Sequence, residues 1–305
     1  MEIILHHFDA SPFAEKARLI MGLKKLAWRT VQIPMVMPKP YLTALTGGYR
    51  KTPVLQFGAE IYCDTRRIAR ELEKRFPTPT LFPGGYGGLA MALATWSDTR
   101  LFEPGAGLAM GVNAGIPEPI LKDRFAFFNF MDFTTLPSEI PHLFGQLTAQ
   151  VELVEEQLAD GRAFMFGERP GWADINAYFA VWMSRGNIAQ VQEQFAPYTR
   201  MAKWEARMAA IGHGTRTGME PADALAIARD TPAEPGTGVA PGEPLVLATG
   251  DTVTVEPDDY GRVPVHGKLI TLNRREISIN RDDERAGNVN VHFPRAGYRV
   301  RRAGG

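Results

Sequence analysis

The sequence predicts a multi-domain α+β protein in which an α/β segment, a helical segment and a β-rich segment follow one another. Residues 1–76 alternate short apolar strands with amphipathic helices, residues 89–211 carry apolar residues at helical spacing, and the C-terminal part alternates β-branched and polar residues. Pro- and Gly-rich stretches at 77–88 and 231–244 separate these three segments. We therefore predict three domains, with the bounds 1–78, 88–230 and 240–305.

Composition narrows the possible partners. The chain has 305 residues, and Lys plus Arg and Asp plus Glu both total 34, so its formal net charge is zero. This balance argues against nucleic acid as a partner, because nucleic-acid binders usually carry a basic face. A single cysteine, Cys63, excludes an internal disulfide framework and a Cys-based metal cluster, and we expect no metal. Without a membrane-spanning run or a signal-peptide pattern, we expect a cytoplasmic protein that does not use a membrane.

The first segment reads β-α-β-α-β-β-α, an order that suits a thioredoxin-like α/β domain. Residues 2–8 form the first predicted strand, and the helix that follows starts near Ser11 and Pro12. The last helix begins at Asp64 and carries Ile68 and Leu72 on one face with charged residues opposite.

The most informative motif lies in the loop before the third strand and in the turn after the fourth. Lys51, Thr52 and Pro53 open an apolar strand, and a cis Thr52-Pro53 bond would leave the main chain of Thr52 free to pair with an extended peptide. Asp64 and Thr65 stand at a helix N-terminus, where free N–H groups and the helix dipole attract a carboxylate. The two features together predict a peptide-binding site with an anion-binding end.

This arrangement resembles the glutathione site of the cytosolic glutathione transferase superfamily. Ser11, Pro12 and Phe13 resemble the tau class, which carries a catalytic serine there, whereas omega-class and glutaredoxin-like members carry cysteine. The motif of a lysine, an apolar residue and a proline also fits, except that Thr52 departs in type. The resemblance covers roughly residues 1–230.

The resemblance implies a role for each of these residues. Ser11 would stabilise the thiolate of glutathione, which is the co-substrate, and the main chain of Thr52, next to Pro53, would pair with its cysteinyl backbone. Lys51 would meet the glycyl carboxylate, Asp64 the γ-glutamyl ammonium, and Thr65 the adjoining carboxylate. The resemblance further implies a homodimer, a small and mostly apolar electrophile as substrate, and a role in detoxification.

Other roles for the same residues stay open at this stage. Ser11 before Pro12 is also an ordinary helix cap. His6 and His7 are competing donors to the thiol, and at most one can face the site because adjacent strand residues point to opposite faces. Cys63 ends a core-type strand and is expected to be a buried, inert thiol.

For the electrophile pocket we predict Phe13, Trp96 and Arg100, because Phe13 flanks Ser11 and the resemblance implies that the fourth helix forms a wall of the site. A core role for Trp96 stays open. The predicted function is a glutathione transferase-like enzyme. One alternative is a non-catalytic transferase-like binding or assembly protein, which the added C-terminal segment favours. A second is a glutathione-dependent reductase, which the absence of cysteine at position 11 opposes, since a mixed disulfide needs a protein thiol.

The C-terminal segment matches no family that we identify. Its pattern predicts about four to six strands in a small barrel or rolled sheet. His266 and His292 do not make a convincing metal pair without nearby ligands, so we expect structural roles for them. A segment of this size is marginal as an independent domain, and we predict that it docks on the transferase body or on a partner subunit.

Overall fold

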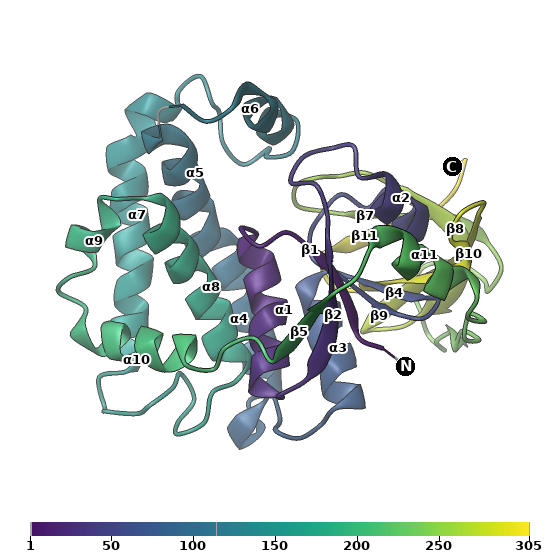
Figure 1. The fold of residues 1–305 in the computed structure, drawn as a ribbon, viewed down its shortest axis with the longest axis horizontal. Helices are drawn as coiled ribbons and strands as arrows, with labels where there is room; N and C mark the ends of the chain where they lie inside the picture. The colour runs from purple at the N-terminus through teal and green to yellow at the C-terminus, as the bar shows by residue number, and fades with distance from the viewer. Residues whose placement is uncertain (1, 114, 305) are drawn as a thin grey trace. The chain divides into compact units, whose positions relative to one another are not determined.

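The computed structural model describes residues 2–113 and 115–304 (Figure 1). Contacts within the chain divide it into two compact units, each described by itself below. The first comprises Met1–Ala14, Ala27–Glu71 and Thr215–Gly305, and the second comprises Glu15–Leu26 and Leu72–Gly214. The C-terminal β-rich segment therefore shares a unit with the N-terminal strands, whereas the three predicted domain bounds stay a prediction.

The first unit is built on one mixed β-sheet, whose strands run in the order β11-β7-β8-β9-β10-β4-β3-β1-β2-β5, with β6 beside β8. The strands are β1 (Ile4–His7), β2 (Ala27–Gln32), β3 (Val54–Phe57), β4 (Glu60–Cys63), β5 (Thr215–Gly218), β6 (Gly238–Val239), β7 (Thr252–Pro257), β8 (Val265–Leu272), β9 (Glu276–Asp283), β10 (Gly287–Pro294) and β11 (Tyr298–Arg302). Helices α2 (Pro40–Thr46) and α11 (Pro221–Arg229) belong to the same unit, and α1 (Pro12–Leu23) and α3 (Thr65–Arg75) begin in it. The predicted order of elements in the thioredoxin-like domain is confirmed.

The C-terminal module, defined as strands β7 to β11 with their connections, is β-rich as predicted. It adds to the N-terminal sheet through β10, which runs parallel to β4 with Val291 opposite Ile61 and His292 opposite Tyr62. Within the module, neighbouring strands pair antiparallel, and buried and more exposed residues alternate along β7, as expected for a strand with one face in the core. The predicted docking of this segment on the rest of the chain thus occurs by pairing of β10 with β4.

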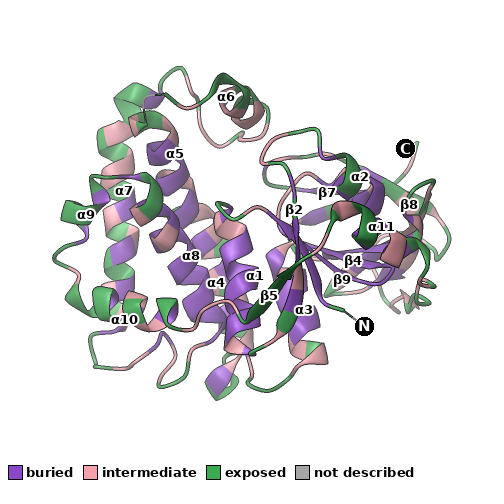
Figure 2. Ribbon diagram, viewed as in Figure 1, coloured by how far each residue is buried: buried purple, intermediate pink, exposed green. Residues whose placement is uncertain are grey.

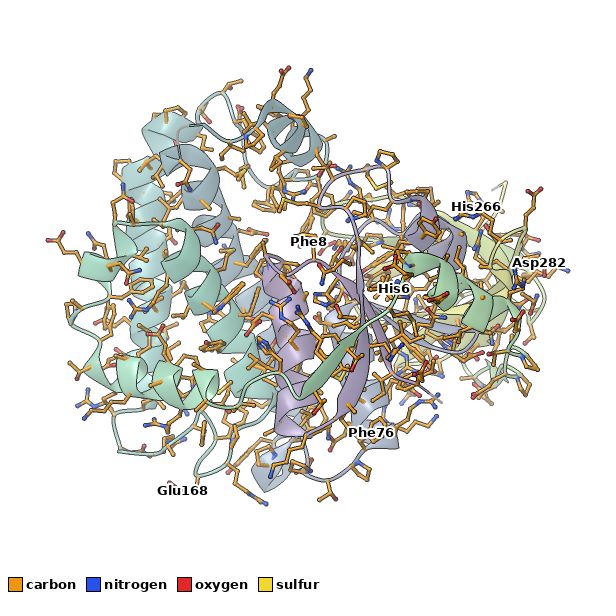
Figure 3. The ribbon with its side chains drawn as sticks, viewed as in Figure 1. His6, Phe8, Phe76, Glu168, His266 and Asp282 are labelled. Carbon is orange, nitrogen blue, oxygen red and sulfur yellow. The ribbon has the colours of Figure 1, made fainter. Side chains whose placement is uncertain are left out.

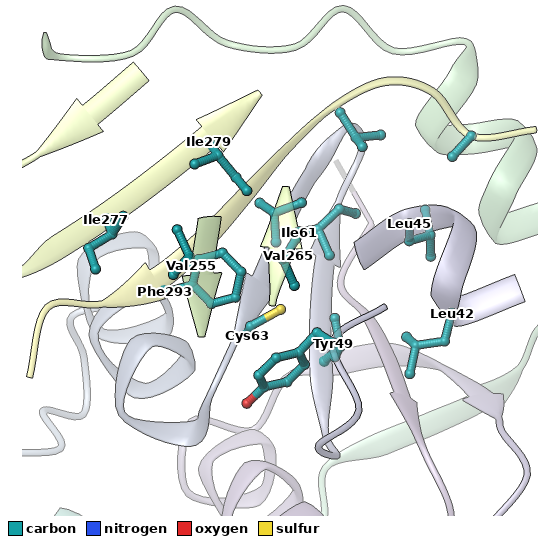
Figure 4. Close-up of a cluster of buried hydrophobic side chains, with 14 of the residues drawn as sticks. Leu42, Leu45, Tyr49, Ile61, Cys63, Val255, Val265, Ile277, Ile279 and Phe293 are labelled. Carbon is teal, nitrogen blue, oxygen red and sulfur yellow. The ribbon is translucent and has the colours of Figure 1, made fainter. Parts of the chain in front are cut away.

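One hydrophobic core joins the module to the N-terminal part of the first unit (Figure 4). Leu42 and Leu45 of α2 and Ile61 of β4 lie in the same buried cluster as Ile279 of β9 and Phe293 of β10. Figure 2 shows buried residues along β4 and β9 of this sheet, whereas β5 is exposed. Because this apolar surface is shared, the module and the N-terminal strands stabilise each other.

The second unit is helical, as predicted. Its elements are the 3₁₀ turn Pro83–Gly85, α4 (Gly87–Trp96), a π-helical turn (Ser97–Leu101), α5 (Phe102–Val112), α6 (Glu118–Phe125), α7 (Leu136–Gln157), α8 (Trp172–Asn187), α9 (Val191–Gln194) and α10 (Thr199–Ala209). Pro104 lies in the first turn of α5, where proline is tolerated, and the π-helical turn separates α4 from α5. No helix in the part of the chain that the structure describes is long and apolar enough to cross a membrane.

Asp174 organises the start of α8. Its carboxylate accepts hydrogen bonds from the main-chain N–H of Gly171 (3.0 Å), from the N–H of Met165 (2.7 Å) and from the indole of Trp204 (2.9 Å). Gly171 has no side chain to act as a cap, so Asp174 supplies the polar contacts at this helix end.

Candidate functional site

The pairing of the N-terminal strands brings the predicted site residues to one end of the sheet. β3 runs antiparallel to both β1 and β4, with His6 opposite Val54 and Val54 opposite Cys63. The end of β1, the start of β3 and the end of β4 therefore lie at the same end of the sheet. Ser11, Thr52 and the Asp64–Thr65 pair, which follow or precede these strand ends, are gathered there.

Ser11 caps helix α1. Its side-chain Oγ accepts a hydrogen bond from the main-chain N–H of Ala14 (3.2 Å), and its own N–H donates to the carbonyl of Phe8 (3.0 Å). Ser11 is buried, and within the described ranges no acceptor for its hydroxyl proton is found. A hydroxyl has one donor and two acceptor sites, so the capping bond leaves the donor available.

The Thr52-Pro53 peptide bond is cis, as predicted. Among the residues that the structure describes, neither the N–H nor the C=O of Thr52 makes a hydrogen bond, whereas its side-chain hydroxyl accepts one from Lys39 Nζ (3.3 Å). Its main chain therefore presents the donor and the acceptor that an extended peptide requires.

Lys39 is a further charged residue beside Thr52 and was not expected from the sequence motifs. This lysine is buried in the connection before α2, and its ammonium lies 5.7 Å from the ring centre of Phe8, which Figure 3 labels near the end of β1. It adds a positive charge beside Thr52. Its position between Pro38 and Pro40 was a signal in the sequence, because two prolines hold the backbone around a single charged side chain.

Asp64 has a left-handed backbone (φ 73°), a conformation in which aspartate is enriched among non-glycine residues. Its carboxylate accepts hydrogen bonds from the N–H of Arg66 (2.8 Å), from the Arg66 guanidinium (2.8 Å) and from the hydroxyl of Tyr298 (3.3 Å). Burial alone would raise the pKa of Asp64, but the charge and hydrogen bonds of Arg66 outweigh burial and lower that pKa. Thr65 begins α3 and is buried, and no partner of its hydroxyl is found among the described residues.

Lys51 is bound by the C-terminal module. Its ammonium lies 2.5 Å from a carboxylate oxygen of Asp259 and 4.1 Å from the ring centre of Tyr260. Lys51 is therefore not a solvated loop lysine, because its side chain is largely covered and paired. For Lys51 to contact glutathione as predicted, its ammonium must either break the ion pair with Asp259 or interact with both carboxylates.

The two histidines and the cysteine have other partners. The imidazole of His6 pairs with Gln56 (2.7 Å), and burial lowers the pKa of His6 to about 4, so it is neutral at pH 7 (Figure 3). His7 pairs with the hydroxyl of Thr30 (2.8 Å). Cys63 is buried, and burial raises its pKa well above the usual value, which makes it the inert thiol expected from the sequence.

The predicted pocket for the electrophile divides between the two units. Phe13 lies in the first turn of α1 and is half-buried. In the second unit, the indole N–H of Trp96 donates to Gln150 (2.7 Å) and Arg100 is exposed. A shared role for the three side chains stays a prediction.

Metal ligands are not clustered anywhere in the described ranges. His292 is buried between the carboxylates of Glu60 and Glu276, each 2.7 Å from a ring nitrogen, whereas His266 is exposed on β8 (Figure 3). His292 therefore has a structural role between two carboxylates, whereas the role of His266 stays a prediction.

Comparison with known proteins identifies two domains. Residues 5–80 match the family model of the glutathione S-transferase N-terminal domain, and residues 137–207 match that of the glutathione S-transferase C-terminal domain. A comparison with curated proteins gave no match.

Solved structures extend this result. A GST-like protein from Pseudomonas syringae is 35% identical, with 99% of each chain covered and a TM-score of 0.78. The tau class glutathione S-transferase of mango, Mangifera indica, is 17% identical, with 68% of this chain and 89% of that chain covered and a TM-score of 0.55. Rice GST1, solved in complex with glutathione, is 22% identical, with 68% of this chain and 85% of that chain covered and a TM-score of 0.50.

The last two similarities concern the fold alone, since their identity is low. The Pseudomonas syringae protein matches over nearly the whole chain, so its similarity extends through the C-terminal module. With the two domain matches and this full-length relative, the chain belongs to the glutathione S-transferase superfamily.

Proposed function

We propose that this protein binds glutathione at the end of the sheet where Ser11, Thr52 and Thr65 meet, and that it activates the thiol for transfer to a small, mostly apolar electrophile. The observation that carries the proposal is the unpaired main chain of Thr52 beside the N-terminus of α3. This combination suits a short peptide with a carboxylate at one end.

The chemistry rests on Ser11. A free thiol titrates at about 8.5, so little thiolate exists at neutral pH without stabilisation. The spare hydroxyl proton of Ser11 can donate to the sulfur, and the N-terminus of α1 adds a favourable dipole. The thiolate then forms a sulfur–carbon bond, and the leaving group departs with the electron pair of the bond that breaks.

The ends of the tripeptide would be held by charged and hydroxyl groups. The Thr65 hydroxyl and the N-terminus of α3 suit the γ-glutamyl carboxylate, and Asp64 suits the neighbouring ammonium. Lys39 and Lys51 supply positive charge for the glycyl carboxylate. We also propose, from family membership, that the protein is a cytoplasmic homodimer.

Calorimetry with glutathione tests this site. Thr65→Val keeps the branched shape and removes the hydroxyl, so we expect binding to weaken by about tenfold or more, because a hydrogen bond to a charged group contributes roughly 1.5–3 kcal/mol. Thr199→Val is a matched control, since Thr199 is the exposed first residue of α10. Absence of glutathione binding at millimolar concentration, or equal effects of the two substitutions, would contradict the proposal.

A non-catalytic binding protein is the second candidate function. The observation that favours it is that module residues already engage Lys51 and Asp64. Glutathione binding without turnover over a broad panel of electrophiles would support this alternative. A reductase is less well supported, because Ser11 replaces the cysteine and Cys63, the only cysteine of the chain, is buried.

A further inference from the structure

The connection between β7 and β8 lies against the loop that precedes β3. Asp259 of this connection forms an ion pair with Lys51 at 2.5 Å, and the ring of Tyr260, which is buried, lies 4.1 Å from the same ammonium. The module thus places a carboxylate and an aromatic face on one side chain of the candidate glutathione site. The side chain of Lys51 is only 13% exposed as a result.

A second contact ties the module to the other end of the site. The hydroxyl of Tyr298, on β11, donates to Asp64 (3.3 Å) and lies 2.9 Å from the hydroxyl of Tyr49. Tyr49 itself lies in the loop before β3 and packs edge-on against Phe293 of β10 (Figure 4). These contacts hold the module on the loop and leave Asp259 next to Lys51.

We propose that Asp259 of the C-terminal module opposes the glycyl carboxylate of glutathione at Lys51, so that ligand binding and docking of the 258–263 connection work against each other. This inference rests on the proposed function. Two carboxylates that approach one ammonium repel each other, and the incoming one finds a charge that is already neutralised. Asp259 therefore weakens the binding of free glutathione relative to tripeptide ligands whose glycyl carboxylate is masked as an ester or amide, because masked ligands do not meet this repulsion.

Linkage makes the effect reciprocal. If Asp259 weakens glutathione binding, then glutathione must weaken the docking of the connection by the same factor. Glutathione should raise amide hydrogen exchange in residues 258–263 of the unmodified protein.

Calorimetry with glutathione and its glycyl ethyl ester tests the proposal. Asp259→Asn should bind glutathione about 2- to 5-fold more tightly, the range for a surface ion pair, since the carboxylate of this pair is exposed. It should bind the ester as the unmodified protein does. Asp258→Asn is the matched control, because Asp258 is the exposed neighbour in the same connection and its side chain has no ion pair among the described residues. We expect no comparable change in the glutathione affinity of Asp258→Asn.

The outcomes separate this inference from the proposed function. If the unmodified protein binds glutathione and Asp259→Asn binds it equally or more weakly, the inference is wrong and the proposed function stands. Binding by Asp259→Asn alone would support both, and binding by neither protein would overturn both. If Asp259→Asn folds poorly, the exchange experiment decides: unchanged or slower exchange at 258–263 with saturating glutathione would overturn the inference.

Discussion

The hydroxyl group of Ser11 can serve two roles with different atoms, one as a helix cap and one, as proposed, toward a thiolate. The oxygen caps α1 by accepting the N–H of Ala14, while the proton has no acceptor among the described residues and can serve a thiolate. The cap and the catalytic role, which compete as explanations when only the sequence is known, are therefore compatible in the folded chain.

Substitutions of Ser11 should separate the two roles. Ser11→Ala and Ser11→Gly both remove the donor, and each should lower turnover by about 10²–10³, as expected for loss of one positioned donor. Ser11→Ala should also cost about 0.5–2 kcal/mol of stability through the lost cap, and Ser11→Gly only a few tenths. Turnover, urea unfolding and the pH at which bound glutathione shows thiolate absorbance measure these effects.

Ser138→Ala is the control, because Ser138 is an exposed helix residue whose hydroxyl donates to the carbonyl of Thr135. Full activity in Ser11→Gly would rule out the hydroxyl as the thiolate donor.

At the scale of elements, an ionic cluster joins β9 and β10 to β4 and α3. His292 lies between Glu60 (2.7 Å) and Glu276 (2.7 Å), and its ring stacks on Tyr62 with ring centres 4.4 Å apart. Both ring nitrogens face carboxylates, so both must donate, which requires the imidazolium form. Arg67 of α3 completes the cluster by pairing with Glu276 (3.1 Å) and with Glu71 (3.0 Å).

The charges of this cluster define a pH window. Burial alone would lower the pKa of His292, but its hydrogen bonds to Glu276 and Glu60 outweigh burial and raise that pKa above the usual 6.5. Burial would likewise raise the pKa of Glu276, but the hydrogen bond with His292 and the charge of Arg67 lower it from 4.5 to about 2. Because its pKa is raised in the folded protein, His292 contributes its full stabilisation below pH 6.5. Because its pKa is lowered, Glu276 contributes its full stabilisation above pH 4.5.

We therefore expect the free energy of unfolding to fall as the pH rises above 6.5 through the pKa of His292 in the folded protein. His292→Gln should remove this part of the decline, because the variant has no proton to lose. Urea unfolding between pH 6 and pH 9 measures the difference between the two proteins. His266→Gln, at an exposed position on β8, should keep the decline; an equal slope in His292→Gln and the unmodified protein would refute the assignment.

At the scale of the whole molecule, the C-terminal module is part of the sheet that carries the candidate site. It covers the edge of β4 through β10 and shares a buried cluster with α2, β3 and β4. An edge strand with unpaired N–H and C=O groups tends to pair with other chains, so the module also protects β4 from association.

Removal of the module should therefore destabilise the chain. A fragment that ends at Asp230 would expose β4 and the apolar side chains that pack against the module, each of which contributes about 1.5–3 kcal/mol when fully buried. A few such residues amount to much of the roughly 5–15 kcal/mol that stabilises a folded protein. We expect a lower melting temperature and self-association, measured by thermal unfolding and size-exclusion chromatography.

Co-expression of the remaining residues, 231–305, is the control and should restore the melting temperature of the full chain at least in part. A fragment 1–230 that is monodisperse and melts at the temperature of the full chain would show that the module is only tethered.

Local signals in the sequence were sufficient for the fold class, and they also indicated a candidate site, whose role stays a prediction. The strand and helix pattern of residues 1–76, Pro53 at a strand start and Asp64 at a helix start depend on neighbouring residues. The structure has the elements predicted for this segment in order, whereas the short strands β5 and β6 were not predicted. The superfamily, inferred from these motifs, is confirmed by the matched domains.

Only the tertiary structure decided which partners the site residues have. Lys51 pairs with Asp259, 208 residues away, and His292 pairs with Glu60 at a separation of 232 residues. The attachment of β10 to β4 also joins segments from the two ends of the chain. Periodicity and turn residues report the local conformation, whereas these contacts depend on which strand covers which sheet edge. Burial of a shared core determines which strand pairs with which sheet edge, and residues far apart in the sequence contribute to that core.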